Sequence, residues 1–288
     1  MSDHRRGILI VATGVVLLSP DALLIRLLPL GTWSIVFWRG VACGGGLCVL
    51  GLLLWGRSLP RRFYAIDDWG LLAAVFSACS GTLFVVSVTH TSVAHTLLIV
   101  AASPIFGAAT SSIFLNEQVS AVTWGACLAV VAGIAVIVRS SLGSPDLVGD
   151  LTALAVSVSA SSTVVVLRHR RDVDMIPAVA LGALVTAGIA APLGGDLSLT
   201  PRAVAVVVVL GLMLPMSLGL VTRGPRYLAA PEVGLLMLVE TVLGPLWVWL
   251  VLGEGPSAQT ILIGVLILGV LGAHSALGLT GRLESLRA

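Results

Sequence analysis

Of the ionisable side chains within the long apolar runs of this sequence, three are the first candidates for chemistry because they lie deep in a run: Asp21, Arg39 and Glu240. A charged group in apolar surroundings is costly, so each one indicates binding, proton transfer or a compensating partner. Glu240 could bind an amine or take up a proton. Alternatively, its carboxyl is structural and hydrogen-bonds across neighbouring helices near a kink at Pro245.

Asp21 and Arg39 are expected at similar depth in successive helices, counted at about 1.5 Å per residue. Asp21 follows Pro20, which removes a backbone hydrogen bond and loosens the helix at that point. One interpretation is a buried ion pair, in which the loss of either partner leaves an uncompensated charge. The other is that Arg39 holds a substrate carboxylate in one state and Asp21 in another.

His95, Ser103 and Thr241 are polar candidates for the same site. His95 begins an expected helix, so it either lines a pathway or is a solvated histidine at a helix end. Ser103 and Thr241 lie near Pro104 and Pro245. They either contact a substrate or hydrogen-bond the backbone groups that the prolines free.

Trp38 and Trp247 are the aromatic candidates. Trp38 adjoins Arg39 and could form part of an amphipathic pocket. Trp247 and Trp249 are two residues apart, which is about 200° around a helix, so at most one of them faces a cavity.

The composition is that of a membrane protein. Of 288 residues, 57% are hydrophobic and 10% are charged, whereas soluble domains carry roughly 25% charged residues. The 16 basic residues are all arginines and face 14 acidic ones, so no nucleic acid is expected as a partner. Without lysine there is no P-loop and no Schiff base. No catalytic residue, cofactor or metal site is expected, since the sequence has no His-Glu-x-x-His and no intact rhomboid-type serine motif.

About 20 apolar residues span a membrane, and ten runs of that kind predict an all-α polytopic protein. The runs are 7–28, 32–55, 69–89, 93–115, 120–139, 147–168, 175–193, 201–222, 230–252 and 258–279. The first could be a cleaved signal peptide, but it lacks a small-x-small cleavage site, which favours a retained helix. With the N-terminus inside, the inner segments hold 12 arginines and the outer ones three, which places both termini in the cytoplasm.

The two halves of the chain share a pattern. Glu117-x-x-Ser-Ala-x-Thr123 leads into the fifth run, and Glu254-x-x-Ser-Ala-x-Thr260 leads into the tenth. Five passes is an odd number, so tandem copies must be inverted, as in secondary transporters. We expect repeats over 1–140 and 141–282, followed by a polar tail over 283–288 that an expression vector could have contributed. Small-residue stripes in the fifth and tenth runs could join the halves or form a homodimer face.

The prolines before these motifs, the stretch 240–254 and Arg39 resemble the EamA-domain family of the drug/metabolite transporter superfamily. The resemblance covers essentially the whole chain. Within the family, the chain resembles bacterial amino-acid and metabolite exporters. The resemblance implies a basket of ten helices in the bacterial inner membrane. It also implies export of small metabolites across the surrounding lipid, with amino acids the first choice and protons a candidate coupling ion. The alternative is a multidrug exporter of lipophilic cations that would use Glu240 and the tryptophans.

Overall fold

The computed structural model describes residues 3–107, 110, 121–140, 143, 144, 146–228 and 230–285. Within these residues all regular structure is helical, which confirms the expected all-α class. The longer helices are α1 (Asp3–Leu18), α3 (Thr32–Trp55), α5 (Asp68–His90), α6 (Val93–Val100), α8 (Ala121–Ser140), α9 (Asp146–His169), α10 (Ile176–Ala190), α11 (Pro201–Val221), α12 (Ala230–Leu252) and α13 (Ala258–Ser285). The short ones are α2 (Asp21–Arg26), η1 (Gly56–Ser58), α4 (Leu59–Tyr64) and η2 (Gly224–Arg226).

Five helical stretches are long and apolar enough to cross a membrane: His4–Arg26, Thr32–Tyr64, Asp68–His90, Asp146–His169 and Pro201–Val221. Five shorter apolar stretches accompany them: Val93–Gly107, Leu128–Arg139, Ile176–Ala190, Leu236–Leu252 and Ala258–Val270. Each predicted run overlaps one of these ten stretches. Ten complete passes and the inverted repeat stay predictions, and the first copy of the shared motif lies outside the described residues from Glu117 to Ser120.

The first predicted run is broken into α1 and α2 at Ser19-Pro20, which forms a turn. The Ser19 hydroxyl donates to the Val16 carbonyl at 2.8 Å, so a side chain satisfies part of the backbone that the proline disturbs. The break places Asp21 in the first turn of α2. A local sequence signal therefore positions one of the candidate charges.

Side-chain caps fix the beginnings of other helices. The Asp67 carboxylate accepts from the Gly70 N–H at 3.0 Å at the start of α5, and Ser92 does the same for His95 at 3.1 Å in α6. Each side chain satisfies one of the donors that the first turn leaves free. At the C-terminal end of α12, Gly253 follows the last helical residue and has a φ of 74°, a conformation that suits glycine.

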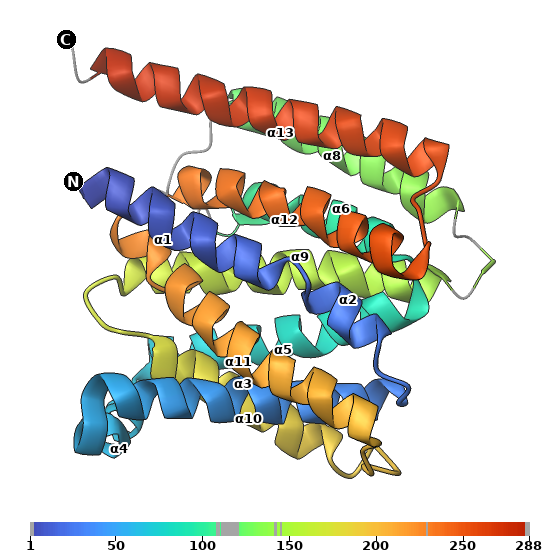
Figure 1. Ribbon diagram of the computed structural model, residues 1–288. Coiled ribbons are helices and arrows are strands. Elements are labelled where there is room, and N and C mark those ends of the chain that lie inside the picture. Colours follow the sequence, from blue (N-terminus) through green and yellow to red (C-terminus); the bar gives the residue numbers. More distant parts are fainter. Residues whose placement is uncertain are drawn as a thin grey trace.

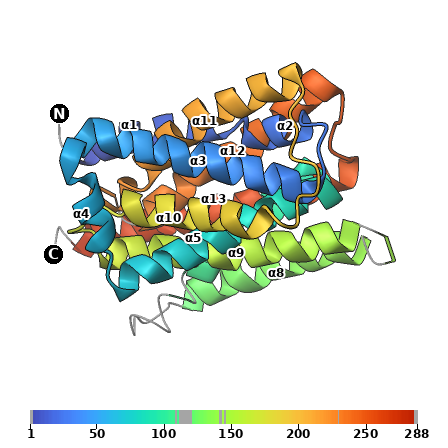
Figure 2. The same ribbon diagram turned by 90° about the horizontal axis from the view of Figure 1, so that it is seen from below.

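The helices run side by side, with both termini and α4 at one end of the bundle (Figure 1). We call this the terminal end. The opposite end, with α2 and the loop between α12 and α13, is the far end. The closest neighbours are α5 with α9 and α3 with α10 and α11 (Figure 2), while α8 and α13 form an outer pair (Figure 1).

Small residues permit this close packing. A Cβ on Gly182 of α10 would lie 2.4 Å from the Ala74 carbonyl oxygen of α5, so only glycine fits there. In the stripe of α8, Gly133 contacts Ile267 of α13 and thus joins the two sequence halves, whereas a Cβ on Gly125 would meet none of the described residues within 4 Å. Gly133 of this stripe therefore takes part in a contact within the chain, whereas Gly125 is not covered by another described helix.

Candidate functional site

A bidentate ion pair lies beside the break between α1 and α2. Arg39 of α3 donates to the two carboxylate oxygens of Asp21, from Nε at 3.2 Å and from Nη2 at 2.7 Å. The side chains are 14% and 2% exposed, respectively, so the pair is almost wholly buried. Parallel hydrogen bonds of this kind fix the orientation of both groups as well as their distance.

α5 completes the surroundings of Arg39. The Nη1 atom lies 3.5 Å from the Gly81 carbonyl oxygen, and the guanidinium carbon lies 5.6 Å from the centre of the Phe84 ring. A carbonyl dipole and an aromatic face both stabilise a desolvated cation. The ion pair therefore ties α2, α3 and α5 together inside the bundle.

Glu240 brings a second carboxyl group to this pair from the other half of the sequence. It lies on α12, is half-buried, and is within electrostatic reach of both Asp21 and Arg39. Two carboxyl groups and one guanidinium thus share a single region. Its formal charge is −1 when all three are ionised, so one positive group or one proton would balance it.

α12 also contacts the helix break directly. The Trp247 indole Nε1 donates to the Ser19 hydroxyl at 3.0 Å, and Thr241 is buried on the same helix. A Cβ on Gly244 would lie 2.2 Å from Leu97 Cδ1, so α12 approaches α6 closely at this level. The predicted residues Asp21, Arg39, Glu240 and Trp247 are therefore gathered around Ser19-Pro20, a point that sequence analysis treated only as a loose turn.

Two predicted residues use their polar groups elsewhere. The Trp38 indole Nε1 donates to the Leu197 carbonyl at 3.1 Å, which anchors the loop between α10 and α11. The Ser103 hydroxyl donates to the Val100 carbonyl, so it satisfies backbone at the end of α6. Ser103 thus hydrogen-bonds the backbone here, which was one of the two roles expected for it. The polar edge of Trp38 points toward a loop.

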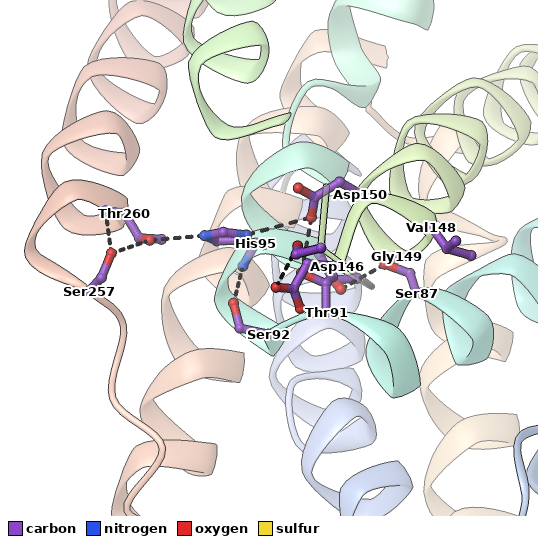
Figure 3. A network of polar contacts seen from close by, with 12 residues as sticks. Ser87, Thr91, Ser92, His95, Asp146, Val148, Gly149, Asp150, Ser257 and Thr260 are labelled. Carbon is purple, nitrogen blue, oxygen red and sulfur yellow. Dashed lines mark hydrogen bonds and ion pairs between the residues drawn. The ribbon is translucent and has the colours of Figure 1, made fainter. Parts of the chain in front are cut away.

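His95 belongs to a separate polar network at the far end (Figure 3). Its Nε2 and the Thr260 hydroxyl of α13 are hydrogen-bonded at 3.1 Å, and its Nδ1 lies 3.5 Å from Asp150 Oδ1 of α9. That second contact is close, but Nδ1 makes no hydrogen bond of good geometry in the described part of the chain. The Thr91 hydroxyl donates to the same Asp150 oxygen at 3.0 Å.

This network joins residues from the two sequence halves. Asp150 is fully buried, and the space beside it admits only glycine at position 149, where a Cβ would lie 2.6 Å from Thr91 Cβ. Arg26 adds a further link, since its Nη2 donates to the Thr91 carbonyl at 2.9 Å and lies 3.8 Å from Glu254. A cleft of about 320 Å³ opens next to His95.

Sequence analysis did not identify Asp150, Thr91 or Ser19 as site residues. Asp146 and Asp150 are four residues apart at the start of a predicted helix, a spacing that puts both on one face. That signal was available for Asp150. Nothing in the local sequence could assign Thr91 to Asp150, because 59 residues separate them.

At the terminal end the contacts are ionic and more exposed. Arg170 pairs with Asp67, whose side chain is 41% exposed, and Arg223 pairs with Asp174 at 3.0 Å. Desolvation opposes ionisation of Asp67, but the Gly70 N–H and the Arg170 guanidinium outweigh it and hold the pKa of this carboxyl below its ordinary value.

The sequence model of the EamA-like transporter family matches residues 5–139, which include α1 to α6 and the Asp21–Arg39 pair. Residues 5–139, slightly less than half of the chain, are thus similar to the EamA-like transporter family. A solved structure described as "Crystal structure of protein" is similar, with a TM-score of 0.67, 19% sequence identity, and coverage of 95% of this chain and 98% of that chain. That likeness concerns the fold alone. No curated protein matches the chain.

This similarity supports a small-molecule transporter of the drug/metabolite transporter superfamily, whose members work within lipid membranes. Family members are transporters, not enzymes. The apolar helices described above agree with an integral membrane protein.

Proposed function

We propose that this EamA-like protein exports small metabolites, with amino acids as the main substrate class, by alternating access. The observation that carries this proposal is the Asp21–Arg39 pair with Glu240 beside it. These groups offer both signs of charge in one buried region. A zwitterion carries the complementary ammonium and carboxylate, so it could exchange with the internal pair without leaving a net buried charge.

The three charges also come from both halves of the sequence. Asp21 and Arg39 belong to 1–140, and Glu240 belongs to 141–282. In an inverted-repeat transporter the substrate site lies between the repeats, near the middle of the membrane. We infer ten passes in this arrangement, with rocking of one five-helix unit against the other.

Orientation follows from the arginines. Twelve of them lie in segments that the sequence predicts to be inside, and three, Arg26, Arg139 and Arg202, lie in segments predicted to be outside. We therefore infer that the terminal end faces the cytoplasm of a bacterial inner membrane. The chain could act as a monomer, or as a homodimer through the open part of the α8 stripe around Gly125.

Glu240 is our candidate for proton coupling. Its carboxyl lies within electrostatic reach of one other carboxylate and one guanidinium, so protonation would remove the net negative charge of the group. Ser103, Thr241, Trp38, Trp247 and His95 remain candidates for substrate contact in other conformational states.

Counterflow in proteoliposomes tests the proposal. Vesicles are preloaded in turn with each of the 20 amino acids, without a pH gradient, and the accumulation of a labelled trace is measured. Selective and saturable exchange is expected. Glu240→Gln should keep the fold but lose transport or its dependence on pH. Transport like that of the wild type between about pH 6 and 8 would remove Glu240 from coupling.

A lipophilic-cation exporter is the second candidate. It is favoured by Glu240 and the half-exposed Trp247 on the same helix, because aromatic faces and a carboxylate together suit organic cations. Exchange of a labelled lipophilic cation, with no exchange of any amino acid in monodisperse protein, would favour this function over amino-acid export.

A further inference from the structure

The chain changes direction where α3 ends at the terminal end. Gly56 follows the last residue of α3 and has a φ of 53°, a positive value that suits glycine. The helices η1 and α4 come next, and α4 runs across the end of the bundle rather than along it (Figure 1 and Figure 2). We call residues 56–64 the α4 hook.

Apolar contacts hold the α4 hook against the bundle. Leu59 is buried, and a Cβ on Gly51 of α3 would lie 2.8 Å from its Cδ1 atom, so the hook packs closely against α3. Trp55 and Phe63 are partly buried against the main hydrophobic core. The Ser58 hydroxyl donates to the Trp55 carbonyl at 2.8 Å. The surface that the hook presents is therefore fixed by packing.

The hook exposes three arginines. Arg57, Arg61 and Arg62 are all exposed, and none of them forms an ion pair with another residue in the described part of the chain. The Arg62 guanidinium carbon lies 4.5 Å from the centre of the Trp55 ring. A cation over an aromatic face keeps its charge and its hydrogen-bond donors available to a further partner.

The neighbouring carboxylates of the terminal end have other partners. Asp67 pairs with Arg170, and Asp174 pairs with Arg223. Asp68 lies in the first turn of α5, where the free N–H groups of the helix compensate a negative charge. The hook thus presents an excess of positive charge, which is complementary to an anion.

Exposed apolar side chains adjoin these arginines. Leu52, Leu53 and Leu54 in the last turn of α3 are exposed, and Tyr64 at the end of α4 is 92% exposed. Such a tyrosine suits the headgroup level of a membrane. A free phosphate ion would leave the leucines uncovered, whereas the acyl chains of a phospholipid would cover them. The surface therefore suits an anion that carries hydrocarbon chains.

We propose that the α4 hook binds an anionic phospholipid of the leaflet that meets the terminal end. The guanidinium groups of Arg57, Arg61 and Arg62 donate to the phosphodiester oxygens of the headgroup, and the acyl chains lie along the exposed leucines of α3. The proposal does not depend on the transported substrate, so it can hold even if the proposed export function fails.

The test measures binding of single lipids to the whole protein in detergent, by native mass spectrometry. Phosphatidylglycerol is compared with phosphatidylcholine of identical acyl chains, whose headgroup has no net charge. The wild type should bind phosphatidylglycerol about tenfold or more tightly, because several arginines contact its headgroup. Arg57→Gln combined with Arg61→Gln should lose most of this preference. The double variant keeps Leu59 and the contact of Arg62 with Trp55, so it should fold, and its thermal unfolding midpoint checks this.

Two controls accompany this variant. Arg5→Gln combined with Arg171→Gln removes the same charge from exposed positions at the same end but outside the hook, so it should bind like the wild type. Glycerophosphoglycerol, the headgroup without its chains, should not bind measurably at the same concentration. Equal binding of the two lipids, unchanged binding by the hook variant, or an equal loss in the control variant would each overturn the proposal. Binding of glycerophosphoglycerol as tight as that of the lipid would also overturn it, since the site would then recognise a free phosphate.

Discussion

Asp21–Arg39 and Asp67–Arg170 are both carboxylate–guanidinium pairs, but their surroundings differ. The first is bidentate and at most 14% exposed in either side chain, and it lies inside the bundle. The second lies at the terminal end, with its side chains 41% and 27% exposed. Water can replace the partner of a surface charge, whereas a buried charge that loses its partner has no substitute. The same two residue types should therefore contribute very differently to stability and function.

The largest effect is expected from breaking the buried pair. Asp21→Asn or Arg39→Gln alone breaks the bidentate pair and leaves the remaining charge without the hydrogen bonds that hold it inside the bundle, at a cost of about 3–5 kcal/mol. The double variant removes both charges and should recover much of the folded protein. Monodisperse yield and thermal unfolding measure the difference. If both single variants fold well and the double variant recovers nothing, the pair is not structural, and separate roles in substrate binding are favoured.

Asp150 offers an intermediate case, since it is a buried carboxylate whose neighbours are a hydroxyl and an imidazole. Asp150→Ala removes the acceptor of Thr91, and an unsatisfied buried donor costs about 1–3 kcal/mol. We expect a smaller loss of thermal stability than for Arg39→Gln. Asp146→Ala, at the exposed end of the same helix, is the matched control. A loss as large as that of Arg39→Gln would show that burial, rather than the type of partner, sets the cost.

Asp67→Asn should have a small effect, below about 1 kcal/mol, because the pair is exposed to solvent. The pKa of Asp67 is lowered in the folded protein, so its contribution is complete at neutral pH. It is lost as the pH falls below about 4, the ordinary range of an aspartate. Thermal unfolding of wild type and variant should therefore differ slightly at pH 7 and converge in acid. A difference that grows as the pH falls would contradict this sign.

Ionic strength should produce the smallest effect and should distinguish the two pairs. The screening length falls from about 30 Å at 0.01 M salt to about 3 Å at 1 M. A double-mutant cycle on Asp67 and Arg170 should lose most of its coupling energy over this range. The cycle on Asp21 and Arg39 should change little, because ions do not enter the bundle. Equal loss in both cycles would mean that solvent reaches the inner pair.

Much of this architecture could be predicted from local sequence. The apolar runs overlap the observed helices, because about 20 apolar residues without breakers favour a helix that can span a membrane. Pro20 predicts the break before Asp21, since proline cannot donate a backbone hydrogen bond. The cost of isolated buried charge also made Asp21 and Arg39 candidates for one another.

Long-range packing decided the rest. His95 as a partner of Thr260, Trp38 as an anchor for Leu197, and Thr91 as a donor to Asp150 each join residues far apart in the chain. Spacing along a helix gives the face on which a side chain lies, but not which helix will cover that face. Close approaches such as Gly182 against Ala74 settle which helices are neighbours.

The sequence by itself therefore determined the class of protein, the approximate helices, the break at Pro20 and the ionisable groups that burial makes expensive. These depend on composition and on interactions within a few residues. Only the tertiary structure decided that Glu240 lies near the Asp21–Arg39 pair, that His95 and Asp150 join the two halves, and that a polar cleft opens beside them. Those features depend on which helix faces pack together, and that choice is made by shape and charge over the whole bundle.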